Sequence, residues 1–116
     1  DTIHLLYGYA PDTEQVIGLR VLASRETPGL GDRIASDATF LAGFDALELR
    51  LDDSGKALQQ RPGVVRQGAV TTPWEFEAIT GATVSSRAVA EALASSASHW
   101  LPKLRQWPAG SEHNEP

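Results

Sequence analysis

The chain of 116 residues suits a single domain, and its 41% of apolar residues are enough to bury a core. Fifteen acidic residues against ten basic ones give a formal net charge of -5, which argues against a nucleic-acid partner and against adhesion to an anionic membrane surface. The absence of cysteine excludes disulfides, thiolate zinc sites, iron–sulfur clusters and cysteine nucleophiles.

No metal centre and no membrane-spanning helix are expected. His4, His99 and His113 are scattered without a metal-ligand spacing. No run approaches the roughly 18 consecutive apolar residues that a spanning helix needs, and no signal peptide is visible. Because the chain begins at Asp1 rather than Met, we expect a processed or trimmed fragment, from which a natural anchor could have been removed.

The first two elements are predicted to form an antiparallel hairpin. Residues 2–10 (TIHLLYGYA) are rich in β-branched, aromatic and aliphatic side chains, as strands are. A Pro-Asp turn follows, and residues 14–24 (EQVIGLRVLAS) form a second, partly alternating strand. Gly18 lies inside that strand, where a glycine marks a bulge or a close backbone approach.

A loop and a helix come next. Residues 25–32 (RETPGLGD) form a loop, because their prolyl and glycyl residues supply turn geometry. Residues 34–44 carry apolar side chains close to helical spacing, which predicts one helix with Ser36 or Asp37 as its N-cap.

The middle of the chain contains short strands. Residues 46–51 (ALELRL) alternate well and predict a strand, and residues 52–55 (DDSG) predict a turn. Residues 64–70 are a further candidate strand. Residues 74–79 are strand-like and follow a connector in which Pro73 restricts its predecessor to extended conformations.

Residues 85–100 (SSRAVAEALASSASHW) form the clearest helix, with Val89, Leu93, Ala97 and Trp100 on one face and Pro102 limiting its end. Residues 110–116 are polar and predict a disordered tail after a domain of residues 1–109. Strands mixed with two helices predict an α+β fold, with an antiparallel sheet and flanking helices.

Residues 77–86 (EAITGATVSS) are the most informative segment for chemistry. A strand-like stretch, a glycine turn and a helix start follow one another. Helix N-termini expose N–H groups, expected here near Val84 to Arg87, that favour an anion such as phosphate. Gly81 and Ala82 are small enough for a ligand to come close. Four hydroxyls surround this point: Thr80, Thr83, Ser85 and Ser86.

The same residues also fit an ordinary helix start, because serine and threonine are common N-caps. On physical grounds alone, capping explains such a short motif more often than a ligand does. The segment is not a P-loop, since no lysine follows its glycine, and not a dinucleotide fingerprint, since it holds a single glycine.

Two segments together resemble a known family. ETPGLGD at residues 26–32 and ITGATVSSRAV at residues 79–89 resemble the FMN-binding domain of Rnf-type and sodium-pumping NADH:quinone reductase complexes, above all the G subunit of the Rnf-type complex. The resemblance covers roughly residues 18–93. Each motif alone is weak, whereas two motifs in the right order are fairly specific.

The resemblance implies FMN attached covalently through its phosphate to the hydroxyl of Thr83. In this family a separate flavin transferase installs the bond from FAD, and the resemblance implies that the domain relays electrons with other subunits of a membrane complex. It also implies a place on the extracytoplasmic side of a bacterial inner membrane, held by an anchor that this chain lacks. The residues placed around the cofactor are Thr83, Glu77, Thr80, Gly81, Ala82, Val84, Ser85 and Ser86, with Glu26, Thr27, Gly29, Leu30 and Gly31 in the other segment.

One residue departs from the family pattern, and a few apolar side chains are candidates for contact with the flavin ring. The family places Asp three residues before the Ser/Thr of the motif, where this chain has Glu77. The flat, apolar isoalloxazine ring favours aliphatic or aromatic walls. Leu30 is the first candidate wall and Trp74 a weaker one. Tyr7 and Tyr9 share one side of a strand, and ordinary packing explains them equally well.

Two other functions remain open from the residues. One is a non-redox module that holds a phosphorylated ligand or a partner protein. The other is a small hydrolase with Thr83 or Ser85 as nucleophile, although no histidine accompanies either in the sequence. A redox carrier is favoured over a stand-alone enzyme, because no acid/base set or substrate pocket is legible.

Overall fold

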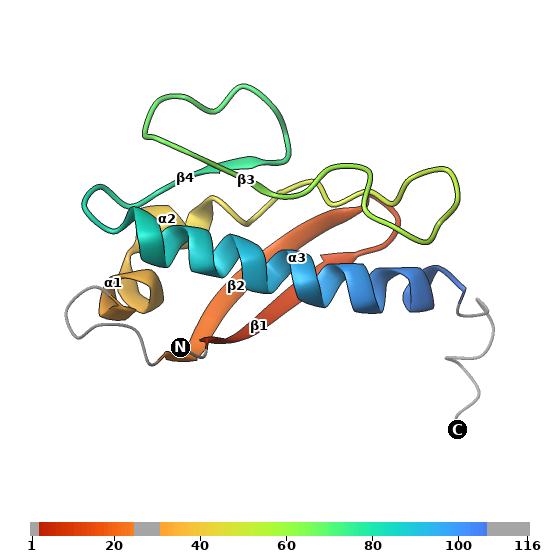
Figure 1. The fold of residues 1–116 in the computed structure, drawn as a ribbon, viewed down its shortest axis with the longest axis horizontal. Helices are drawn as coiled ribbons and strands as arrows, with labels where there is room; N and C mark the ends of the chain where they lie inside the picture. The colour runs from red at the N-terminus through yellow and green to blue at the C-terminus, as the bar shows by residue number, and fades with distance from the viewer. Residues whose placement is uncertain (1–2, 25–30, 107–116) are drawn as a thin grey trace.

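The computed structural model describes residues 3–24 and 31–106. In chain order, the elements are β1 (Ile3–Ala10), β2 (Gln15–Ser24), α1 (Gly31–Ser36), α2 (Ala38–Ala42), β3 (Gly63–Val65), β4 (Glu75–Glu77) and α3 (Thr83–Arg105). The long helix α3 crosses the β1–β2 hairpin, while the short helices and β3–β4 lie around its N-terminal half (Figure 1). The predicted α+β fold is confirmed. The predicted tail lies outside the described residues.

The hairpin is confirmed, and its irregularity lies beside Gly18. β1 and β2 pair antiparallel, with Gly8 opposite Gly18 and Tyr9 opposite Val16. The extra residue between those two pairs is Ile17, so β2 carries a bulge next to the predicted glycine. The close approach occurs at Gly8, where an added Cβ would lie 2.8 Å from Cγ1 of Ile17.

The prediction of a single helix over residues 34–44 is wrong, because the helical conformation is interrupted at Asp37. Asp37 is extended (φ -76, ψ 108), and its carboxylate accepts a hydrogen bond from the Phe40 N–H at 2.8 Å. A short acidic side chain offers the backbone this alternative to a helical bond, so it ends α1 and caps α2. Asp37, one of the two predicted caps, therefore does cap a helix, but a shorter one.

The alternation of residues 46–51 correctly predicts which side chains are buried, but the predicted strand does not form. Leu47, Leu49 and Leu51 are buried, whereas Arg50 is exposed. The segment contacts its neighbours through isolated bridges, such as Gln15 with Glu48, rather than a continuous ladder. The turn at residues 52–55 is confirmed by the hydrogen bond from the Gly55 N–H to the Asp52 carbonyl at 2.9 Å.

The strand expected over residues 64–70 is shorter than predicted. β3 ends at Val65, and Gly68 turns the chain with a φ of +82. β4 then returns parallel to β3, and two glutamates hold the connection. Glu77 accepts a hydrogen bond from the Gly68 N–H at 3.1 Å. Glu75 accepts from the Thr71 N–H at 2.8 Å, and this bond lowers the pKa of Glu75.

Helix α3 extends past both predicted ends. It continues three residues beyond Pro102, which removes a single helical hydrogen bond and does not end the helix. Val89, Leu93 and Ala97 are buried as predicted, but Leu101 continues this face and Trp100 is 54% exposed. The buried face drifts around the helix because α3 crosses the hairpin obliquely (Figure 1).

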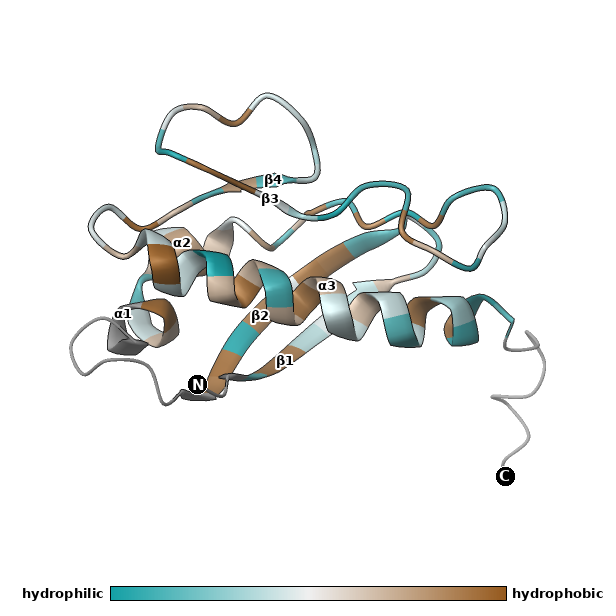
Figure 2. Cartoon of the chain, viewed as in Figure 1, coloured by the Kyte–Doolittle hydropathy of each residue, from teal (hydrophilic) through white to brown (hydrophobic). Residues whose placement is uncertain are grey.

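The core fills the space between the hairpin, α2, β4 and α3. The rings of Phe40, Phe44 and Phe76 form a cluster with centroids 4.4 to 5.9 Å apart. Brown, apolar stretches alternate with polar residues along β2 and α3, as one-sided burial requires (Figure 2). Tyr7 and Tyr9 pack against this core; the Tyr9 hydroxyl donates to the Leu49 carbonyl at 2.8 Å.

Candidate functional site

The junction between β4 and α3 is a tight turn at the helix entrance. The Ala82 N–H donates to the Ile79 carbonyl at 2.9 Å, and Gly81 between them has a φ of +82. A side chain at Gly81 would be strained in this left-handed conformation. Ala82 is 2% exposed and anchors the turn in the core. The turn therefore fixes where the first residue of α3 lies.

Ser86 holds this turn from inside. Its side chain is fully buried, and its Oγ accepts a hydrogen bond from the Ile79 N–H at 3.1 Å. The same hydroxyl donates to the Ala82 carbonyl at 2.8 Å. Ser86, predicted as a cofactor contact, is thus committed to the geometry of the turn.

Burial separates the four candidate hydroxyls into two pairs. Ser85 and Ser86 are 2% and 0% exposed, whereas Thr80 and Thr83 are exposed. Thr83 is the first residue of α3, and Thr80 lies inside the turn, directly before Gly81. The burial of Ser85 also argues against the hydrolase that used it as nucleophile.

Capping by a serine or threonine side chain does not explain this motif. The N-cap of α3 is Ala82, which has no side-chain capping bond. The N–H groups available at the helix start belong to Thr83 and Val84, because the helix begins two residues earlier than predicted. The Ser86 N–H already bonds to the Ala82 carbonyl at 3.0 Å, and Arg87 lies within the helical ladder, so the expected range 84–87 was too late.

The environment of this helix start suits an anion with an apolar body. The first turn of α3 holds no acidic residue, so nothing there opposes the positive end of the helix dipole. Val84 is 77% exposed, the largest exposed fraction among the large apolar residues described. An apolar side chain with so much surface in water has contact area to offer a ligand.

The other predicted site residues are placed unevenly. Glu77 lies in β4, with its carboxylate on the Gly68 N–H. Trp74 is half-buried, and its backbone carbonyl accepts a hydrogen bond from the N–H of Gly63, the first residue of β3, at 2.9 Å. Gly31 begins α1. Outside the described residues lie Glu26, Thr27, Gly29 and Leu30.

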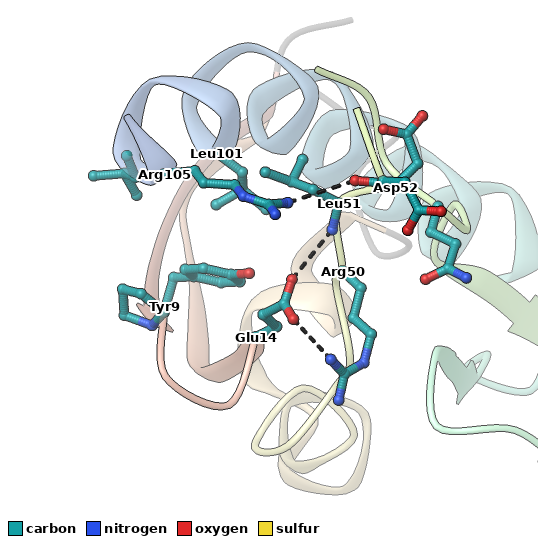
Figure 3. A pocket seen from close by; sticks show the side chains of 11 residues that line it. Tyr9, Glu14, Arg50, Leu51, Asp52, Leu101 and Arg105 are labelled. Atoms are coloured by element: carbon teal, nitrogen blue, oxygen red, sulfur yellow. Dashed lines mark hydrogen bonds and ion pairs between the residues drawn. The ribbon is translucent and has the colours of Figure 1, made fainter. Parts of the chain in front are cut away.

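A pocket of about 480 Å³ at the opposite end of α3 was not predicted (Figure 3). Glu14 occupies its centre with a φ of 57, and its carboxylate pairs with Arg50 at 2.7 Å. Arg105 donates to the Asp52 carbonyl at 3.5 Å. Burial, followed by the charge of Glu14, raises the pKa of Tyr9 to about 12. Most of these polar groups form hydrogen bonds or ion pairs within the protein. They come from distant parts of the sequence, so no local sequence pattern indicates the pocket.

Neither a metal centre nor a membrane span is present in the described residues, 3–24 and 31–106. They contain no group of three side chains able to hold a metal ion. None of their helices is long and apolar enough to cross a membrane.

Comparison with known proteins decides the family. The model of the FMN-binding domain family matches residues 1–98. The chain belongs to this family. The FMN-binding domain is 33% identical over 105 residues to the G subunit of the ion-translocating oxidoreductase complex of Pasteurella multocida, covering 90% of this chain and 46% of that relative. It is 37% identical over 93 residues to the corresponding protein of Pseudomonas aeruginosa, covering 78% and 38%.

A solved structure supports the fold of the FMN-binding domain. The crystal structure of Shewanella oneidensis NqrC matches with a TM-score of 0.60 and 29% identity, over 85% of this chain and 42% of that one. The family resemblance indicated by the two motifs is thereby confirmed. The domain spans less than half the length of each of these proteins.

Proposed function

We propose that this domain carries FMN as a phosphoester on Thr83 and relays electrons within a membrane redox complex. The observation that carries the proposal is the position of Thr83: an exposed hydroxyl on the first residue of α3, directly after a turn fixed by Gly81 and Ser86. Thr80 is exposed as well, but it lies outside the helix. Ser85 is buried.

The helix start supplies what the singly charged phosphodiester of an attached FMN needs. The N–H groups of Thr83 and Val84 have no acceptor among the described residues, and the dipole of a 23-residue helix adds a partial positive charge. Such placement is worth about 0.3–1 kcal/mol at a surface. The exposed side chain of Val84 offers the flavin ring an apolar contact next to the attachment point.

Attachment is a phosphoryl transfer to Thr83. The Thr83 Oγ1 attacks the phosphorus of FAD that bears the ribityl chain, forming the Oγ1–P bond as the pyrophosphate P–O bond breaks and AMP leaves. The hydroxyl proton must pass to a base. No described side chain bonds to the Thr83 hydroxyl, and we propose that a flavin transferase supplies the base. Glu77 keeps the acidic character of the family position and is proposed to assist attachment. The bound flavin supplies the redox chemistry.

The setting of the domain is part of the proposal. The relatives are named as subunits of ion-translocating oxidoreductase complexes, which supports electron transfer with further subunits. We place the domain on the extracytoplasmic side of a bacterial inner membrane, held through an anchor outside this chain. The electron donor and acceptor are then neighbouring subunits of the complex.

Co-expression with a flavin transferase tests the attachment site. For the chain without substitutions, intact mass spectrometry should show a mass gain equal to FMN less one water. Thr83→Val keeps the shape of the side chain and should abolish this gain. Thr80→Val is the matched control, an exposed threonine three residues away, and should retain it. Covalent flavin on Thr83→Val would refute the assignment, and a protein that never acquires flavin bands would favour the non-redox phosphate-binding module.

A further inference from the structure

We infer that the guanidinium of Arg87 binds the phosphodiester of a flavin attached to Thr83 and holds it against the start of α3. The inference rests on the proposed attachment at Thr83 and adds a cofactor-binding side chain to that site. Arg87 lies in the second turn of α3, four residues after Thr83, and both residues are exposed.

The spacing of the two residues brings Arg87 within reach of the phosphate. Four residues of an α-helix rise about 6 Å, and side chains four apart lie on the same face. Helical side chains lean toward the N-terminus, so the natural direction of the Arg87 side chain is back over the turn that begins with Thr83. Thr83, Arg87, Glu91 and Ser95 form one exposed stripe along α3. A phosphate on the Thr83 hydroxyl would lie at the N-terminal end of this stripe.

Arg87 is a cation without an acidic partner among residues 3–24 and 31–106. The ion pairs found there join other residues. Glu91 is the only acidic residue of α3 and lies one turn after Arg87, but its carboxylate pairs with Arg61 at 3.0 Å. The first turn of α3 holds no acidic residue. The helix therefore presents a free cation beside the Thr83 hydroxyl, and its own carboxylate is already paired elsewhere.

The chemistry of Arg87 suits a phosphodiester. A guanidinium stays charged throughout the physiological pH range, and its parallel N–H donors match two phosphate oxygens. The backbone N–H groups of Thr83 and Val84 approach the same phosphate from the helix end. FMN joined to Thr83 keeps two non-bridging phosphate oxygens and one negative charge, so both sets of donors can bind it at once. An ordinary surface arginine would not distinguish the flavinylated chain from the unmodified one.

The test compares the Tm of the unmodified and the flavinylated chain. The protein is expressed with and without a flavin transferase, and intact mass identifies the flavinylated form. Arg87→Gln should change the Tm of the unmodified chain little, because the side chain is exposed and unpaired there. The flavinylated chain, followed by flavin fluorescence, should lose roughly 2–4 °C more. This extra loss should shrink in 1 M salt, where the screening length is about 3 Å.

Two variants separate this contact from a general effect of charge. Lys103→Gln is the matched control, since it removes the same charge from an exposed position of α3 that lies 20 residues after Thr83, about 30 Å along the axis. Its effect on Tm should be the same in both forms. Arg87→Lys keeps the charge but not the parallel donors, so its extra loss should be smaller than that of Arg87→Gln.

Nuclear magnetic resonance follows the contact in the chain without substitutions. The Nε–H signal of Arg87 in proton–nitrogen spectra is identified by its absence in Arg87→Lys. It should move by several linewidths on flavinylation, because the guanidinium gains a charged acceptor. The Nε–H signal of Arg61, which pairs with Glu91, should move less. These two signals also decide the question if Arg87→Gln acquires no flavin.

The possible failures are distinguishable. A chain that gains no flavin mass with the transferase refutes the proposed attachment and this inference with it. If flavin attaches but Arg87→Gln lowers the Tm equally in both forms, only the role of Arg87 is wrong. An equal extra loss in Lys103→Gln overturns that role as well, and so does an Arg87 signal that stays in place on flavinylation.

Discussion

Ser86→Ala tests the role of the buried hydroxyl at the helix entrance. The substitution removes the acceptor of the Ile79 N–H and the donor to the Ala82 carbonyl. Leaving a buried N–H without a partner costs about 1–3 kcal/mol. The better helix propensity of alanine returns at most about 0.5 kcal/mol. The net expectation is a loss of about 1–2 kcal/mol in the free energy of unfolding.

Urea and thermal unfolding followed by circular dichroism measure this loss. A loss of that size in a domain of about this length lowers Tm by roughly 5–10 °C. Ser95→Ala, an exposed serine in the same helix, is the control and should be neutral or slightly stabilising. Because the Ser86 hydroxyl is buried, covalent flavin should still form on Ser86→Ala. If Ser86→Ala has the same free energy of unfolding as Ser95→Ala, the structural role assigned to this hydroxyl is incorrect. The same holds if Ser86→Ala keeps its full stability but no longer acquires covalent flavin, while Ser95→Ala still does.

Three further predictions follow from single contacts. Asp37→Ala removes the N-cap of α2 and should cost about 0.5–2 kcal/mol in chemical unfolding, with an unchanged value arguing that the cap is dispensable. Folding raises the pKa of the Tyr9 phenol from 10.0 to about 12, so the unfolded chain ionises at lower pH than the folded one. The contribution of Tyr9 to the free energy of unfolding is therefore complete below pH 10.0 and is lost as the pH rises toward about 12. An ultraviolet titration should show one late-ionising tyrosine that Tyr9→Phe removes; a single transition near the ordinary pKa would contradict this. Glu77→Gln keeps an oxygen for the Gly68 N–H and should retain stability while lowering the fraction of flavinylated protein. A large loss of stability with normal flavinylation would make Glu77 a purely structural residue.

The sequence predicts those elements whose pattern is local. The strand-like composition of residues 2–10, the partial alternation of residues 14–24 and the helical spacing from Val89 to Ala97 are local signals, so the hairpin and the long helix could be predicted. The turn at Gly81 could also be predicted, because a left-handed residue favours glycine. The leucines of residues 46–51 indicate burial but do not show whether a neighbouring strand pairs with this segment. In the structure the segment forms only isolated bridges.

Other features depend on competition or on distant contacts. Asp37 lies within a helical spacing of apolar residues, and only its own hydrogen bond to the Phe40 N–H divides the helix. Thr83 and Ser86 have the same chemistry in the sequence, whereas burial in the folded chain separates an exposed hydroxyl from a structural one. The pocket around Glu14 is assembled from segments more than 30 residues apart in the chain, such as the one holding Arg50, so no spacing could indicate it.

The bulge in the hairpin has a consequence for how sequences of this family can vary. Ile17 lies over Gly8 so closely that a Cβ there would be 2.8 Å from its Cγ1, while a Cβ on Gly18 would meet nothing within 4 Å. The two glycines are paired across the strands, yet their tolerance of substitution should be opposite. Position 18 should accept many residues in a library of variants. Position 8 should accept a side chain only in company with a smaller residue at position 17, so that the two positions covary although they belong to different strands.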